Sequence, residues 1–155
     1  MMLDIGCGER KKKGCIGLDL RKTSSVDVVA DARMLPFRDE AFDYIYSSHL
    51  LEHFSHREVK NVLVEWVRVL KTGGTIEIRC PDLRARALLF LLNPSWQNVR
   101  NIYGAQASPE NTHKCEFSFG LLKGLLESVG IKDVKRIIKG YKGIPFLPDR
   151  LHVRG

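Results

Sequence analysis

The Leu-Asp-Ile-Gly-Cys-Gly run at residues 3–8 constrains the fold of this chain more than any other stretch. Two apolar residues flank the acid, and the run then breaks into Gly6 and Gly8. A short buried strand that ends in such a turn lets the backbone approach a ligand closely, because glycine has no Cβ and accepts positive φ. In open α/β sheets, ligands bind outside the carboxyl ends of the strands. The stretch therefore predicts an α/β fold with a ligand site at the turn after the first strand.

Two later strands are each predicted to end in an acid. Residues 15–20 are typical of a second strand with Asp19 near its end, and residues 26–31 of a third that Asp31 closes. The Asp19 carboxylate can accept hydrogen bonds from both hydroxyls of a ribose, and Asp31 from an amino group such as that of adenine. Taken singly, Asp31 also fits a turn or cap, and Gly8 a tight turn. Their order in successive strands favours a pocket for an adenosine.

Composition places the chain among soluble single-domain proteins. It has 155 residues, of which 44% are hydrophobic and 28% charged. No apolar run approaches the roughly 20 residues that span a bilayer, and no signal peptide is recognised before the first strand. The four cysteines have neither C-x-x-C nor zinc spacing, so we expect reduced thiols in a cytoplasmic protein. No metal site is predicted.

The chain is basic, with 25 Lys and Arg against 18 Asp and Glu and a net charge of +7. Basic residues cluster at 10–13 and again at 132–142. Such clusters suit either an anionic partner such as nucleic acid or an ordinary solvated surface, and we favour the surface. No aromatic interleaving and no zinc finger supports a nucleic-acid-binding module.

Alternating strand and helix signals predict a mainly parallel Rossmann-like sheet of about seven strands, with helices on both faces. The first strand is expected at residues 2–6, and the strands after the third at residues 42–47, 75–80, 134–138 and 151–153. Residues 7–14 leave room for one helical turn at most, so the first helix is expected to be reduced or missing. No helical cover is expected before the first strand. The last two strands follow each other directly, which favours an antiparallel edge strand.

Capping signals predict four helices. Ser55 and Glu58 form a capping box before an apolar stripe that ends at Gly73 and Gly74. The other helices are expected to be capped by Asp82 over residues 83–92, by Ser95 up to about residue 103, and by Ser118 up to Gly130, with Ile131 folded back on Leu126. Residues 104–117 form a long polar loop, which we expect to be a lid.

These motifs, taken in order, resemble the class I S-adenosylmethionine-dependent methyltransferases, in their small type 11 branch. Residues 3–8 and 17–19 resemble the first two motifs of the family. The motifs that follow are matched at residues 31–37, 41–53 and 69–74. Beyond about residue 80 the resemblance is looser, and residues 113–117 resemble methyltransferases of unassigned substrate. The resemblance implies a single methyltransferase-like domain over the whole chain.

S-adenosylmethionine is the cofactor that the resemblance implies. It implies that Gly6 and Gly8 line the methionine portion, that Asp19 holds the ribose, and that Asp31 with Ala32 reads adenine. Asp4 would orient the turn or bind the amino group through water. The residues expected to contact the cofactor are Asp4, Gly6, Cys7, Gly8, Asp19, Leu20, Asp31, Ala32, Arg33, Ser47 and Ser48. We expect Leu35 and Phe37 to pack on the base.

Two departures from the family pattern concern helical cover near the pocket. The family usually has helix before the first strand and a full helix between the first two strands. Less cover can weaken cofactor binding, or leave room for a partner or for self-association as a homo-oligomer.

Histidines supply the candidate general bases for methyl transfer. His49 follows the fourth strand at the expected pocket rim, and His113 lies in the expected lid. His53 is a further candidate, with a capping or packing role as the alternative. His56 and His152 are assigned to surface or structural roles. A neutral imidazole can deprotonate a hydroxyl or an amine near neutral pH.

Two functions compete with methyl transfer. A nicotinamide dehydrogenase is disfavoured on two grounds. Lys11 occupies the place of the third glycine of the dinucleotide-binding fingerprint, and Asp19 follows the glycines sooner than the roughly 20 residues that the fingerprint requires. A non-catalytic cofactor-binding or scaffold protein is favoured only by the reduced helical cover. For a methyltransferase, a small-molecule acceptor is expected rather than RNA, because no RNA-binding module is recognised, and no membrane partner is expected.

Overall fold

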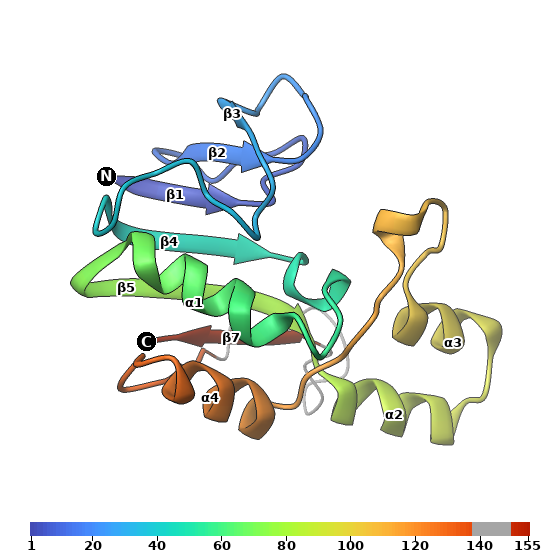
Figure 1. Cartoon of the computed structure of the whole chain (residues 1–155). Coiled ribbons are helices and arrows are strands. Elements are labelled where there is room, and N and C mark those ends of the chain that lie inside the picture. The colour runs from blue at the N-terminus through green and yellow to red at the C-terminus, as the bar shows by residue number, and fades with distance from the viewer. Residues whose placement is uncertain (138–149) are drawn as a thin grey trace.

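A single sheet runs through the part of the chain that the structure, a computed structural model, describes: residues 1–137 and 150–155 (Figure 1). Its strands are β1 Met2–Ile5, β2 Ile16–Asp19, β3 Val28–Val29, β4 Phe42–Ser48, β5 Leu70–Pro81, β6 Lys135–Arg136 and β7 Arg150–Arg154. Their order is β3-β2-β1-β4-β5-β7-β6. Strands β1 to β5 pair in parallel, and β7 pairs antiparallel with both β5 and β6. This confirms the mainly parallel sheet of about seven strands with an inserted antiparallel strand.

The strand order reverses at β1, which lies between β2 and β4. Ile5, the last residue of β1, pairs with Leu18 on one side and with Ser47 on the other. The chain therefore leaves β1 toward one edge of the sheet and returns on the opposite side of β1. Such a reversal opens a crevice at the carboxyl ends of the two central strands.

One face of the sheet carries the hydrophobic core. The helices are α1 Val59–Val69, α2 Leu83–Leu92, α3 Trp96–Tyr103 and α4 Phe119–Ser128, with single 3₁₀ turns η1 Leu51–His53 and η2 Pro109–Asn111. Helices α1 and α4 lie on this face, whereas α2 and α3 extend beyond the carboxyl ends of the strands (Figure 1). Alternate strand residues such as Leu3 and Ile76 pack with Trp66 of α1, all fully buried. Burying each contributes about 1.5–3 kcal/mol.

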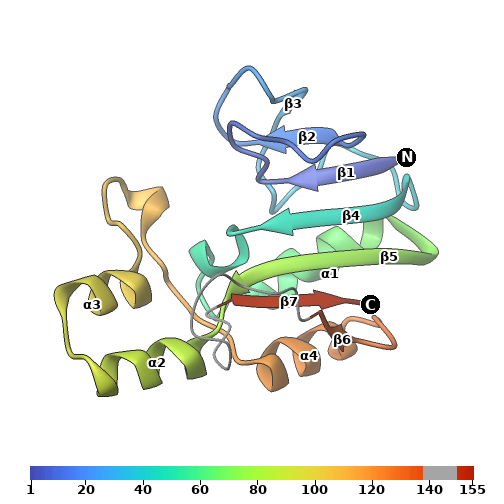
Figure 2. The same ribbon diagram turned by 180° about the vertical axis from the view of Figure 1, so that it is seen from behind.

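The opposite face is polar, and the segment that joins β1 to β2 crosses it as a loop. Residues 6–15, which join β1 to β2, form turns only, as the reduced first helix predicted. Lys12 of this loop donates to the Tyr44 hydroxyl at 2.6 Å, and its Nζ lies 4.0 Å from the centre of the Tyr46 ring. In Figure 2 no helix of the described residues covers this face. Helices were expected on both faces of the sheet. In the described residues, helices cover one face only.

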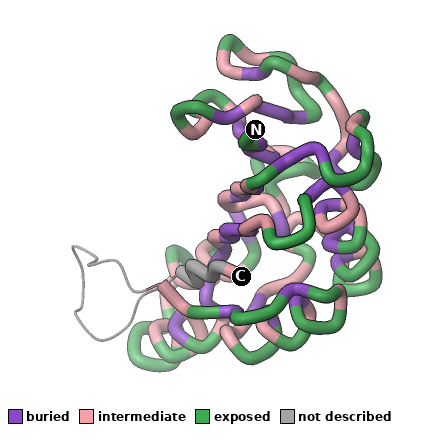
Figure 3. The backbone as a smooth tube through the Cα atoms, turned by 90° about the vertical axis from the view of Figure 1, so that its left-hand side faces the viewer, coloured by how far each residue is buried: buried purple, intermediate pink, exposed green. Residues whose placement is uncertain are grey.

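Burial follows this arrangement through the molecule. In Figure 3 the buried segments run through its middle, and the exposed ones gather on its outer turns. Within the described residues, no helix is long and apolar enough to cross a membrane.

The start of α1 corrects the predicted capping box in part. The Ser55 N–H donates to Glu58 Oε2 at 3.0 Å, which is one half of the box. The other half is replaced by a turn, because the N–H of Glu58 donates to the Ser55 carbonyl at 2.9 Å in place of the Ser55 side chain. The regular helix therefore begins at Val59, after the predicted box.

The end of α1 differs from the predicted boundary at Gly73 and Gly74. The helix stops at Val69, because Leu70 already pairs with Phe42 of β4. The register between β4 and β5 then shifts, and residues 71–74 form the irregular part of β5, where Gly73 has φ +78°. Strand pairing therefore overrides the glycine signal, and β5 is longer than predicted.

The other predicted helices begin where the sequence indicated. The side chains of Asp82, Ser95 and Ser118 each accept an N–H from the first turn of α2, α3 and α4 respectively. Gly130 has φ +95°, and the Ile131 N–H donates to the Leu126 carbonyl at 3.0 Å, which confirms the predicted Schellman arrangement.

Short strands at the sheet edges differ from their predicted lengths. The third strand, predicted over residues 26–31, contains two residues, because only Val28 and Val29 pair with β2. The sixth, predicted over residues 134–138, is β6 in its described part, and residue 138 lies outside the described residues. The seventh falls within β7, but the role expected for the His152 side chain lies outside the described side chains.

Candidate functional site

A cleft of about 490 Å³ opens at the carboxyl ends of β1, β2 and β4. Seven residues predicted to contact the cofactor line it: Gly6, Gly8, Asp19, Leu20, Asp31, Ala32 and Arg33. The crevice expected from the strand order and the residues expected from the motifs therefore coincide.

The glycine turn forms the floor of this cleft. Gly6 and Gly8 have φ of +73° and +55°, which glycine adopts without strain. A Cβ on Gly6 would lie 2.8 Å from Cδ2 of Leu50, whereas a Cβ on Gly8 would meet no atom within 4 Å. Because Gly8 lines the cleft, that open space is available to a ligand.

Asp19 joins the ends of β1 and β2. Its Oδ2 accepts the N–H of Gly8 at 2.9 Å, and its Oδ1 accepts the N–H of Arg21 at 2.9 Å. These bonds hold the carboxylate at the cleft, where Asp19 is 9% exposed. An ionised carboxylate has about four acceptor positions, so two remain for a ligand.

Asp31 lies farther along the same wall and is bound by Arg33. The Arg33 guanidinium donates to both carboxylate oxygens, at 3.1 and 2.7 Å, and its N–H donates to Oδ1 at 2.8 Å. The side-chain bond from Arg33 lowers the pKa of Asp31 despite partial burial. The backbone of Ala32 is bonded to the core, because its carbonyl accepts the Nε1–H of the buried Trp66 side chain at 2.9 Å. This wall therefore offers a carboxylate that stays ionised and backbone that is held in place.

Four predicted cofactor residues do not line the cleft. Asp4 accepts the N–H of Lys12 at 2.6 Å, so it orients the loop after β1, and burial raises its pKa. Ser47 is buried and donates to the Ile5 carbonyl at 3.0 Å. Ser48 is half-buried at the end of β4.

Cys7, the fourth of these, is buried under the glycine turn. Burial raises the pKa of its thiol to about 11, and the charges of Asp4 and Asp19 add to the effect. The structure therefore gives Cys7 a packing environment between Gly6 and Gly8.

Leu35 and Phe37, which were expected to pack on the base, are not among the residues that line the cleft. Leu35 is buried in the core, and Phe37 packs edge-to-face on Phe42, with ring centres 4.9 Å apart. Apolar cleft wall comes instead from Leu18, Leu50 and Phe54. Sequence pattern did not separate these from core residues, because an apolar side chain facing a cleft and one facing the core follow the same periodicity.

The expected lid borders the cleft. Ser108, Glu110, Asn111 and Lys114, all from loop 104–117, line it, and the loop contains the short helix η2. The Lys114 N–H donates to the carbonyl of Glu52 at 2.8 Å, which ties the loop to η1.

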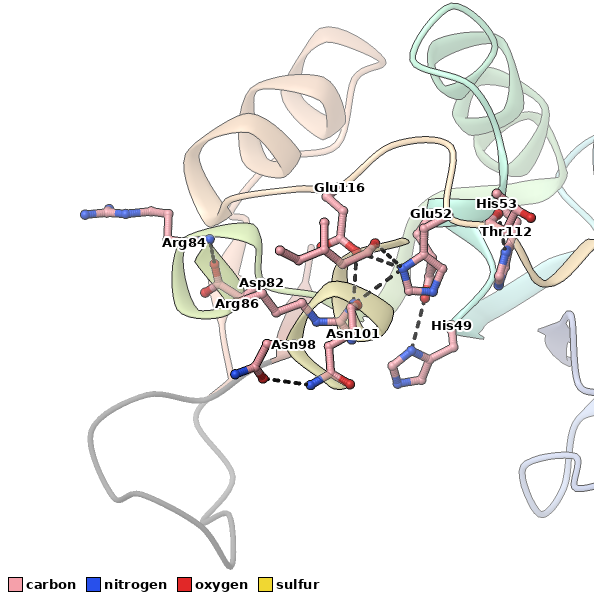
Figure 4. Close-up of polar contacts among 12 residues, drawn as sticks. His49, Glu52, His53, Asp82, Arg84, Arg86, Asn98, Asn101, Thr112 and Glu116 are labelled. Atoms are coloured by element: carbon pink, nitrogen blue, oxygen red, sulfur yellow. Dashed lines mark hydrogen bonds and ion pairs between the residues drawn. The ribbon is translucent and has the colours of Figure 1, made fainter. Parts of the chain in front are cut away.

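Of the candidate bases, His49 and His53 line the cleft, and His113 does not. His49 has φ +55°, and its Nδ1 lies 3.0 Å from Oε1 of Glu52. His113 lies behind His53, with ring centres 5.2 Å apart. Figure 4 shows His49, Glu52 and His53 close together at the end of β4. His56 is exposed, as expected.

Comparison with known proteins agrees with this geometry. Residues 3–78 match the model of a family described as "Methyltransferase domain". The human protein named "Probable tRNA methyltransferase 9B" is 33% identical over 93 residues, which covers 50% of this chain and 20% of that protein. The chain thus spans about a fifth of the length of this curated relative.

Solved structures share the fold. A SAM-dependent methyltransferase from Archaeoglobus fulgidus has a TM-score of 0.67 at 20% identity, over 99% of this chain and 84% of that one. A Haloferax volcanii protein, solved in complex with the Trm112 methyltransferase activator, has a TM-score of 0.62 at 15% identity, over 99% and 80% of the two chains. Residues 3–78 therefore belong to the methyltransferase-domain family, and the solved structures show that the chain has the fold of class I S-adenosylmethionine-dependent methyltransferases.

Proposed function

We propose that this protein binds S-adenosylmethionine in the cleft and transfers its methyl group to an acceptor. The observation that carries the proposal is the Asp19 carboxylate, buried at the cleft and bonded to the N–H of Gly8 at 2.9 Å. The two acceptor positions left on Asp19 suit the two hydroxyls of a ribose. Family membership and the strand order support the same reading.

The residues of the cleft fit the cofactor along its length. The open space at Gly8 suits the methionine portion, because no side chain occupies it. Asp31 and the backbone of Ala32 suit the adenine, and Leu18, Leu50 and Phe54 supply apolar walls. When bound, S-adenosylmethionine supplies an electrophilic methyl on its sulfonium. The protein then has to orient the cofactor, exclude water and remove a proton from the acceptor.

We assign proton removal to His49. Its Nδ1 faces Glu52, so Nδ1 carries the hydrogen and Nε2 is the free acceptor. His49 lines the cleft, where an acceptor has to approach the methyl group. The role proposed from sequence for His113 does not fit as well, because His113 is not among the residues that line the cleft.

A small molecule is the acceptor that we favour. Loop 104–117 contributes Ser108, Glu110, Asn111 and Lys114 to the wall of the cleft, and a cleft of about 490 Å³ suits a compact acceptor. RNA is the second candidate, supported by the name of the human relative, by the net charge of +7, and by Arg21, Arg33 and Lys114 at the cleft.

A transfer assay tests the proposed function. The protein is incubated with S-adenosylmethionine labelled in its methyl group and with cell extract separated into small molecules, RNA and protein. We expect label in the small-molecule fraction with wild type, and at least a tenfold lower rate with His49→Asn. Label confined to RNA would support the second candidate. Cofactor binding without label in any fraction would support the scaffold alternative.

A further inference from the structure

We propose that Glu52, His53 and His113 form a binding site for a divalent transition-metal ion beside the methyl-transfer cleft. One ligand atom from each of the three residues lies within 4.8 Å of the others. Glu52 and His53 belong to η1, and His113 belongs to loop 104–117. The two segments lie against each other (Figure 4), and the Lys114 N–H of the loop donates to the Glu52 carbonyl. Metal–ligand bonds of about 2.0–2.2 Å need ligand atoms roughly 3–4 Å apart, so small side-chain rotations complete the site.

Glu52 provides the strongest argument, because its carboxylate is buried with one oxygen unused. The residue is fully buried. Its Oε1 faces Nδ1 of His49, while its Oε2 has no hydrogen-bond partner among the described residues. Among residues 1–137, whose side chains the structure describes, no Lys or Arg forms an ion pair with it. A buried carboxylate without compensation costs several kcal/mol, and a cation at Oε2 would supply the compensation.

Both histidines present a free nitrogen for a metal. His53 Nδ1 lies 3.1 Å from the carbonyl of Thr112, and His113 Nδ1 lies 3.0 Å from the carbonyl of Ile102. Carbonyls only accept, so Nδ1 carries the hydrogen in each ring and Nε2 keeps its lone pair. His113 Nδ1 also lies 2.8 Å from Oε1 of Glu116. Metal-bound histidines usually donate their other N–H in this way.

The surrounding backbone and charges hold the three residues in place. The Glu52 carbonyl accepts the N–H groups of Lys114 and Cys115, the two residues that follow His113, at 2.8 and 3.2 Å. Glu116 is neutralised by Arg86, whose Nη1 lies 2.9 Å from it in an environment where both side chains are about nine-tenths buried. Glu52 is therefore the carboxylate whose charge a metal would balance.

Two imidazoles and one carboxylate indicate which metals fit. This ligand set suits Zn²⁺, Fe²⁺ or Mn²⁺, whereas Mg²⁺ and Ca²⁺ prefer oxygen ligands alone. Cys115 is near, but its Sγ is not among the ligand atoms that lie within 4.8 Å of one another, so Cys115 is not part of the site.

The site connects to the proposed function through His53, which also lines the cleft. Three protein ligands leave coordination positions for an oxygen of the acceptor. This role rests on the proposed function and indicates an acceptor with a hydroxyl group. The hydroxyl loses its proton to Nε2 of His49, its oxygen bonds to the methyl carbon, the bond from that carbon to sulfur breaks, and S-adenosylhomocysteine leaves. The metal lowers the pKa of the hydroxyl.

Metal binding is tested directly, without methyl transfer. The chelator-treated full chain is titrated with Zn²⁺ and with Mg²⁺ by calorimetry, and with Co²⁺ by visible absorption. His53→Asn and His113→Asn keep a donor at the Nδ1 position and remove Nε2, so each fold should survive. Glu52→Gln removes the charge. His56→Asn, an exposed histidine outside the cluster, is the matched control.

We expect one Zn²⁺ per chain, an absorption band with Co²⁺ and no binding of Mg²⁺. Removing a residue that only hydrogen-bonds to a metal ligand costs ~10–100-fold in metal affinity. Each cluster variant removes a ligand itself, so its Zn²⁺ affinity should fall by more than this, and that of His56→Asn should not change. Zn²⁺ affinity unchanged in His53→Asn and His113→Asn would overturn the site. Asp19→Ala separates the two proposals, since it should abolish cofactor binding and keep the metal. Metal binding in a chain without transfer activity would leave the site standing and reject the proposed function.

Discussion

Asp19 Oδ2 accepts the N–H of Gly8 at 2.9 Å, so the acid that ends β2 holds the glycine turn that follows β1. The two residues are eleven apart in sequence and form one unit in the fold. This bond explains why a Gly-x-Gly turn and an acid at that distance work together. The turn makes space, and the carboxylate both fixes the turn and accepts from the ligand.

Removing the Asp19 carboxylate should abolish most cofactor binding. We expect Asp19→Ala to weaken S-adenosylmethionine binding by on the order of 2–4 kcal/mol, because two charge-assisted hydrogen bonds are lost. Isothermal titration calorimetry measures this, with Glu127→Ala, an acid of α4 paired with Lys123, as the control. Equal affinity in Asp19→Ala and wild type would remove the ribose role.

A methyl group at Gly8 should reduce affinity more than stability. Gly8→Ala adds a Cβ in the cleft and about 1 kcal/mol of strain at φ +55°. Gly73→Ala is matched, since Gly73 has φ +78° and equally open space, but it lies far from the cleft, in β5. We expect similar losses in urea unfolding for both variants, and an affinity loss for Gly8→Ala alone. An equal loss of affinity in both variants would contradict the open space as a ligand position.

Acid stability should depend on Asp43. Hydrogen bonds from Lys71 and from the N-terminal ammonium lower the pKa of Asp43 to about 2, below its ordinary 3.8. A carboxyl with a lowered pKa in the folded state stabilises above its unfolded pKa and loses this contribution as pH falls toward 2. Asp43→Asn should therefore be less stable than wild type at pH 6, and the difference should shrink below about pH 4. Urea unfolding at a series of pH values measures it, and a difference that grows on acidification would be inconsistent.

The cysteines should react slowly in the native protein. Burial raises the thiol pKa of Cys7 to about 11 and of Cys115 to about 12, and it also raises those of Cys15 and Cys80. Since the thiolate is the nucleophile, we expect little alkylation by iodoacetamide at pH 8 and full alkylation after denaturation. Mass spectrometry counts the labels. Fast native labelling of Cys7 would contradict a buried, protonated thiol under the glycine turn.

Local signals in the sequence predicted the parts of the site that are close in sequence. Gly6, Gly8 and Asp19 fall within one short β-loop-β segment, so alternation and glycine chemistry suffice to predict their meeting. Helix caps such as Ser118 were predicted for the same reason, because a cap depends on three neighbouring residues.

Features set by distant contacts were not predictable in this way. The end of α1 was wrong because Leu70 pairs with Phe42, 28 residues earlier, and pairing outweighs the glycine signal. The cluster of Glu52 with His113 joins residues about 60 apart with no shared motif, and no metal site was predicted from sequence. Such meetings are determined by the tertiary fold.

A crystal structure with S-adenosylhomocysteine tests the central claim most directly. The account predicts both ribose hydroxyls within hydrogen-bond distance of the Asp19 carboxylate, adenine beside Asp31 and Ala32, and the homocysteine portion over Gly6 and Gly8. A ligand bound elsewhere, or a ribose with no contact to Asp19, would contradict it.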